Sequence, residues 1–123
     1  MLPIISIAPS IIFDNCIKYS PLDSSIYIDF ERVYKDISIT IQSIGPKVYE
    51  DEMKKLKTKG FRGENAKELT SEGRGIGLHY LSVICDLCNI KLSISSDSNS
   101  YSLNGLEYSN FKINLIVPEK NQP

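Results

Sequence analysis

The sequence has almost no net charge and no long apolar run, and each absence excludes a class of protein. Its 14 lysines and arginines nearly balance 15 aspartates and glutamates, so the net charge is -1. This balance gives no reason to expect nucleic acid or an anionic membrane as a partner. The apolar stretches fall far short of the ~20 residues that span a bilayer, and no secretory signal is recognisable at the N-terminus. We expect a soluble, cytoplasmic domain without membrane contact, whether or not a parent protein is anchored to a membrane.

Metal-binding and redox side chains are also scarce. Three cysteines and the single His79 leave a structural zinc site short of ligands. Cys85 and Cys88 form a C-x-x-C pair, but this pair ends a helical pattern instead of opening a helix, where a thiolate would be activated. We therefore expect reduced cysteines that pack a helix.

The pattern of apolar residues predicts one α+β domain over residues 1–118, followed by a tail over 119–123. Helices are expected at 9–19, 49–57 and 79–88, a long polar loop at 58–74, and strands at 25–32, 36–42, 90–96 and 108–117. These elements predict a two-layer sandwich, in which one mixed, mostly antiparallel sheet carries its helices on one face. The abrupt start at Leu2 and Pro3 favours a fragment that lacks a first strand.

A glycine-rich stretch runs directly into the last predicted helix. Glycines let a backbone approach an anion closely, and the start of a helix offers unpaired N–H groups and the positive end of its dipole. The stretch therefore predicts a phosphate-binding loop, although such a cluster is also found in ordinary turns. It consists of Gly73, Arg74, Gly75, Ile76, Gly77 and Leu78.

Positive charge gathers just before this stretch. The cluster suits either a solvated helix face or an electrostatic funnel for a phosphate ligand, and the sequence alone does not separate the two. Its members are Lys54, Lys55, Lys57, Lys59 and Arg62.

Four motifs in order resemble the ATP-binding catalytic domain of bacterial sensor histidine kinases, within the GHKL superfamily that also includes gyrases, chaperones and mismatch-repair ATPases. Residues 14–21 (DNCIKYSP) are similar to the N box, 42–48 to the first glycine box, 60–63 (GFRG) to the phenylalanine box, and 73–78 to the second glycine box. Residues 111–118 are similar to the family's final strand. The resemblance covers nearly the whole chain.

The resemblance implies a site for Mg²⁺ and ATP. Asn15 is expected to be the metal residue, since a neutral amide oxygen suits Mg²⁺. Lys18 is expected to meet a terminal phosphate, and Tyr19 to flank the nucleotide. Arg62 and Arg74 would reach the phosphates from the long loop. The alternatives are an amide on the helix surface, a solvated lysine, a half-buried aromatic ring and ordinary arginines on a loop.

Two departures bear on specificity and chemistry. The family's first glycine box carries an aspartate that accepts a bond from the adenine amino group, but here Ser43 stands at that position. Gly45 is kept, while Lys47 replaces a second glycine. The related ATPases carry a glutamate base four residues before the N-box asparagine, whereas this chain has Ile11. An isoleucine cannot activate water, which favours a kinase over a hydrolase.

The implied function is to hold Mg-ATP and pass its γ-phosphoryl group to a histidine on a separate dimerisation domain, which would in turn serve a response regulator. His79 lies on the helix after the glycines and receives no phosphoacceptor role. One alternative is a degenerate GHKL module that senses nucleotide or binds protein without kinase activity. Another is a serine kinase of the anti-sigma-factor type, against which the abrupt start argues.

The exchange of a charged acceptor for the Ser43 hydroxyl predicts weak discrimination between ATP and GTP, with phosphate and Mg²⁺ binding kept. Charged and neutral hydrogen bonds differ by about 1 kcal/mol. Titration calorimetry with both nucleotides tests this expectation, and strong ATP selectivity at micromolar affinity would contradict it.

Overall fold

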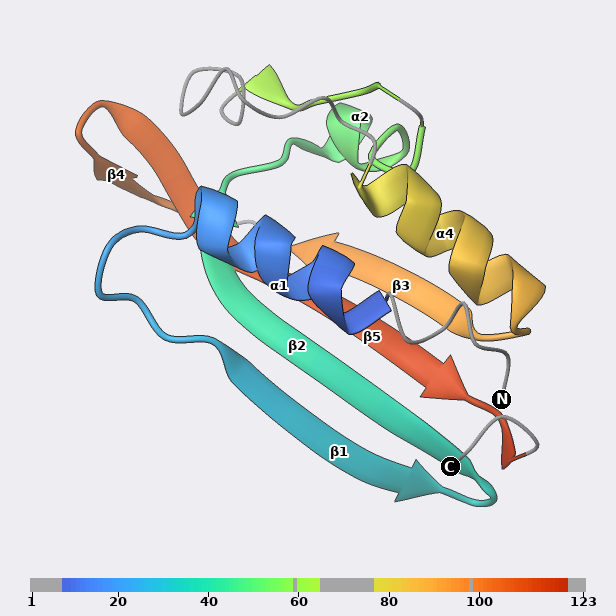
Figure 1. Ribbon diagram of the computed structural model, residues 1–123. Coiled ribbons are helices and arrows are strands. Elements are labelled where there is room, and N and C mark those ends of the chain that lie inside the picture. Colours follow the sequence, from blue (N-terminus) through green and yellow to red (C-terminus); the bar gives the residue numbers. More distant parts are fainter. Residues whose placement is uncertain (1–7, 59, 65–76, 98, 120–123) are drawn as a thin grey trace.

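The protein is described here by a computed structural model, which covers residues 8–58, 60–64, 77–97 and 99–119. Figure 1 shows the arrangement of its elements. In chain order they are α1 (Ala8–Tyr19), β1 (Tyr27–Val33), β2 (Asp36–Pro46), α2 (Glu50–Met53), α4 (Gly77–Leu87), β3 (Lys91–Ser96), β4 (Tyr101–Leu103) and β5 (Leu106–Val117).

One open sheet carries the helices on a single face. The strands lie in the order β1-β2-β5-β3, and β4 pairs with β5 beyond this path. Figure 1 shows α1 and α4 side by side over the face formed by β2, β5 and β3. The predicted α+β fold with helices on one face is therefore confirmed. All pairings among the described strands are antiparallel, so the expected mixed character has no counterpart in this part of the chain.

The core lies between these two layers. Leu81 on α4 is 0% exposed and Ile113 on β5 is 1% exposed. From α1, Ile12 and Cys16 contribute to the same cluster, as their helical spacing predicts. Among the described helices, none is both long and apolar enough to cross a membrane.

Strand β1 is where the predicted burial is wrong. Alternation predicts a half-buried strand, and the register does place Ile28 opposite Ile41 and Phe30 opposite Ile39. All seven residues of β1 are nevertheless exposed, with Phe30 at 67%. The strand is exposed because no described helix packs over β1, whereas α1 lies over the neighbouring strands (Figure 1).

The sequence predicts that the first glycine box breaks the strand pattern after residue 42. The structure shows no break there. Strand β2 continues to Pro46, because β5 pairs with it from Ile37 onward and places Gly45 opposite Ser109 and Pro46 opposite Tyr108. The charged helix predicted over 49–57 is also shorter, since α2 ends at Met53 and turns follow.

The sequence pattern predicts only a polar turn between the strands at 90–96 and 108–117, whereas the structure has the short strand β4 and a tight turn from β4 into β5 in this region. Asn104 and Gly105 have φ values of 53° and 82°. Positive φ at both central residues is what a two-residue hairpin turn of type I′ requires, and Asn-Gly is its preferred sequence. This dipeptide was therefore a signal for the hairpin.

All three cysteines are free and buried, which confirms the expected reduced, packing role. Burial raises the pKa of the Cys85 thiol from its usual 9.0 to about 11, with smaller contributions in the same direction from Cys88 and Asp86 and an opposing one from Lys57. In the folded protein Cys85 thus stays protonated at a pH where an exposed thiol has ionised.

The free energy of unfolding is expected to fall between pH 9 and pH 11. In this window the unfolded chain has released the Cys85 proton while the folded chain retains it, so a rising pH favours unfolding. Urea denaturation at several pH values should show a shallower pH dependence for Cys85→Ala than for the wild type. Comparing slopes separates titration from the packing that the variant loses at every pH, and equal slopes would contradict the assignment.

Candidate functional site

A pocket of about 300 Å³ opens between α1, the end of β2, the segment after α2 and the start of α4. Antiparallel pairing with β5 holds the end of β2 in place beneath α1, which brings sequence-distant motifs together. Most of the site residues expected from the sequence line this one pocket: Asn15, Lys18, Tyr19, Ser43, Gly45, Arg62, Gly77 and Leu78.

The remaining expected residues, Gly73, Arg74, Gly75 and Ile76, lie outside the described residues. Their assignment to a phosphate loop stays a prediction.

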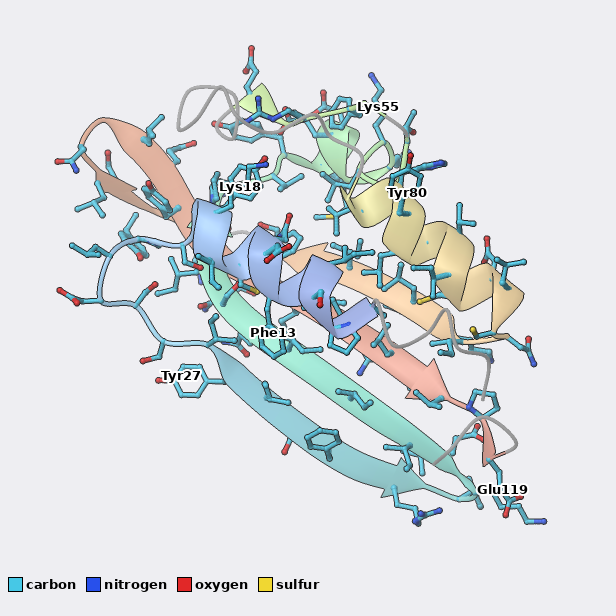
Figure 2. The ribbon with its side chains drawn as sticks, in the orientation of Figure 1. Phe13, Lys18, Tyr27, Lys55, Tyr80 and Glu119 are labelled. Carbon is cyan, nitrogen blue, oxygen red and sulfur yellow. The ribbon has the colours of Figure 1, made fainter. Side chains whose placement is uncertain are left out.

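Helix α1 supplies one wall of the pocket. Asn15 and Tyr19 are four residues apart and so lie along one side of the helix, while Ile12 and Cys16 face the core. Figure 2 shows Lys18 projecting from the carboxyl end of α1, away from β1. Its ammonium nitrogen lies 5.6 Å from the centre of the Tyr19 ring. One helix therefore presents an amide, a cation and an aromatic ring beside the cavity.

The segment after α2 is tied in place by one carboxylate. The N–H of Tyr49 donates to Glu52 Oε1 at 3.0 Å, and the N–H of Glu64 donates to Glu52 Oε2 at 2.8 Å. The buried Gly63 lies against this carboxylate, since a Cβ added there would come within 3.3 Å of an oxygen. These contacts hold the preceding residues, Phe61 and Arg62, in the pocket wall.

Ser43 and Cys16 lie together in the pocket wall. Ser43 is 4% exposed and Cys16 is 2% exposed. Their side chains hydrogen-bond each other; burial raises the pKa of the Cys16 thiol, and the bond with Ser43 opposes part of that rise. At the position where the resemblance implies a carboxylate, this chain has a neutral hydroxyl paired with a neutral thiol.

Ile11 occupies the wall near the start of α4. Its Cγ2 would lie 3.8 Å from a Cβ added to Gly77. Among the described lining residues the acidic side chain is Asp14, which is exposed on α1. The Ile11 position therefore adds an apolar side chain to the pocket and no base.

Sequence reasoning missed the apolar part of the wall and one hydroxyl. The prediction of a break at residues 43–46 excluded the end of β2 from the pocket wall. The alternation of side chains that continues through these residues was the available signal for that part of the wall. The hydroxyl belongs to Ser20, which directly follows α1 within the N-box segment but receives no role there. The missed residues are Ser20, Ile44, Pro46, Val48, Leu56 and Phe111.

The described residues hold no cluster of three or more His, Cys, Asp or Glu side chains that could bind a metal. A cation in this pocket would need a neutral ligand such as Asn15 together with oxygens from a bound ligand, which is a coordination that Mg²⁺ accepts. His79 does not line this pocket. Its Nδ1 lies within hydrogen-bond distance, 3.1 Å, of the carbonyl oxygen of Lys57.

A second, polar pocket of about 330 Å³ lies between α4 and β3. None of the expected site residues lines it. Its wall includes Lys57, Ser82, Asp86 and Lys91.

The chain is similar in sequence and in fold to histidine kinases. The chain is 31% identical over 90 residues to the histidine protein kinase SaeS of Staphylococcus aureus, an alignment that covers 70% of this chain and 25% of that protein. The chain thus spans about a quarter of the length of the curated relatives that it matches.

Solved structures show the same fold. The mycobacterial sensor histidine kinase MprB has a TM-score of 0.74 at 18% identity, over 90% of this chain and 69% of that one. The catalytic domain of histidine kinase ThkA has a TM-score of 0.69 at 19% identity, over 94% of this chain and 67% of that one. The sequence model of the family of histidine kinase-, DNA gyrase B- and HSP90-like ATPases matches residues 8–117, and the chain belongs to this family.

Proposed function

We propose that this chain is the catalytic ATP-binding domain of a sensor histidine kinase, with the domain at residues 1–118 and a tail at 119–123. It binds Mg-ATP in the pocket beside α1 and presents the γ-phosphate to a histidine on a separate dimerisation domain, which serves a response regulator. The observation that carries this proposal is the convergence of Asn15, Lys18 and Arg62 on one pocket that also includes the start of α4. Without that dimerisation domain, the chain is expected to lack phosphotransfer to histidine.

The polar residues of the pocket fit a metal-bound triphosphate. The Asn15 amide oxygen would hold the cation, and Mg²⁺ when bound neutralises charge on the phosphate oxygens. Lys18 and Arg62 add positive charge on two sides of the cavity. Gly77 begins α4, whose first N–H groups have no partner within the helix and suit an anion.

The apolar wall fits a nucleobase. Phe61 and Phe111 line the cavity with the aliphatic side chains of β2 and the turn after α2, and flat bases gain free energy from such surroundings. Leu78 and Tyr19 would flank the nucleotide. Ser43 would supply the hydrogen bond to the base edge in place of a carboxylate.

The apolar side chain at Ile11 favours phosphoryl transfer to a protein over hydrolysis. A water molecule that attacks the γ-phosphate needs a group to orient or deprotonate it, and isoleucine offers neither. Phosphoryl transfer depends mostly on positioning and charge neutralisation, which Asn15, Lys18 and Arg62 can provide.

The pairing of Ser43 with Cys16 also favours a second candidate, a degenerate module of the same fold that senses nucleotide or binds protein without kinase activity. A hydroxyl that already bonds a thiol has less hydrogen-bonding capacity left for adenine. Absence of Mg-ATP binding by the wild-type chain would favour this candidate.

Asn15→Ala should weaken binding of Mg-ATP about 10-fold or more, because it removes a neutral ligand that contacts a cation. Affinity for ATP in the presence of EDTA should change much less. Titration calorimetry under both conditions measures the two effects.

Asn99→Ala is the matched control, since Asn99 is exposed in the connection between β3 and β4 and does not line the pocket. Equal affinities for Asn15→Ala and wild type in Mg²⁺ would remove Asn15 from the metal site.

A further inference from the structure

The hydroxyl of Ser20 lies within the N-box segment at residues 14–21, but it has no role among those proposed so far. Ser20 follows α1 directly, and its N–H donates to the carbonyl oxygen of Cys16 at 2.9 Å. Ser20 is one of the residues that line the pocket beside α1. The hydroxyl oxygen is buried and has no hydrogen-bond partner in the part of the chain that the structure describes.

A buried hydroxyl without a partner lowers stability, so its retention next to a cavity calls for an explanation. The contrast with Ser24 is direct. Ser24 lies four residues later, and its hydroxyl donates to the carbonyl oxygen of Pro21 at 2.6 Å. One serine of this turn is thus satisfied within the chain, whereas the other, beside the pocket, is not.

The position at the end of α1 restricts what Ser20 can bind. The carbonyl groups of the last helical turn carry partial negative charge, which disfavours phosphate oxygens and favours hydrogen-bond donors. Ribose hydroxyls are the neutral donors that a nucleotide offers between its phosphates and its base. A hydroxyl can both donate to and accept from another hydroxyl, so serine suits this partner.

We propose that the Ser20 hydroxyl hydrogen-bonds the ribose of the bound nucleotide. To reach the nucleotide, the buried hydroxyl would change to another of its staggered positions by rotation about the Cα–Cβ bond. This inference rests on the proposed function, because it assigns part of the same nucleotide site. It makes Ser20 a residue that distinguishes ribonucleotides from nucleotides without sugar hydroxyls.

Binding of ATP and of 2′,3′-dideoxy-ATP to Ser20→Ala and wild type, in Mg²⁺, tests the proposal. Ser20→Ala should weaken ATP binding roughly 3- to 10-fold, as expected for one neutral hydrogen bond. Dideoxy-ATP should bind both proteins equally. Without nucleotide, the thermal midpoint of Ser20→Ala should equal or exceed that of the wild type, since the substitution removes an unsatisfied buried group.

Ser24→Ala is the matched control. It should lower the thermal midpoint through the lost bond to Pro21 and leave both affinities unchanged. An equal loss of ATP and dideoxy-ATP binding by Ser20→Ala, or no loss of either, would overturn the proposal. Failure of the wild type to bind either nucleotide would instead contradict the proposed function itself.

Discussion

The long antiparallel pairing of β2 with β5 is the constraint on which the rest of the structure depends. It runs from Ile37 opposite Val117 to Pro46 opposite Tyr108, and these two strands form the centre of the sheet. Its middle carries the core residues Ile41 and Ile113. Its far end extends the same ladder into the pocket, so the scaffold that buries the core also fixes the position of Ser43. Packing and binding are therefore set by one pair of strands.

Helix α1 contributes to both the core and the pocket, because its helical periodicity places different residues on the two sides. Ile12 and Cys16 are four residues apart and bury one face against the sheet, while Asn15 and Tyr19 follow the same spacing on the side of the cavity. A rotation of the helix about its axis would expose the core residues at the same time as it moved the polar ones. Burial of the apolar face thus holds the candidate metal ligand in place at little additional cost in conformational entropy.

Much of the fold was predictable because it is local. The helical spacing in α1 and the alternation in β2, β3 and β5 were sufficient for the α+β architecture, and the motifs were sufficient to name most of the pocket's polar residues. The sequence could not predict which strands a helix covers. The alternation of apolar and polar residues in β1 is the same whether or not a helix lies over Phe30. The end of β2 was hidden by Gly45 and Pro46, which are poor strand residues until β5 pairs with them. Ser20 could not be found at all, since its missing partner is a property of three-dimensional packing.

The central claim is that the pocket beside α1, and not the polar pocket between α4 and β3, holds the metal-bound nucleotide. Amide and side-chain NMR spectra recorded with a non-hydrolysable ATP analogue, first with Mg²⁺ and then with paramagnetic Mn²⁺, test it most directly. We predict that the signals of Asn15 and its neighbours on α1 broaden most strongly, while those of Ser82 and Lys91 beside the second pocket broaden less. Broadening centred on Ser82 and Lys91, or no broadening at saturating nucleotide, would contradict the account.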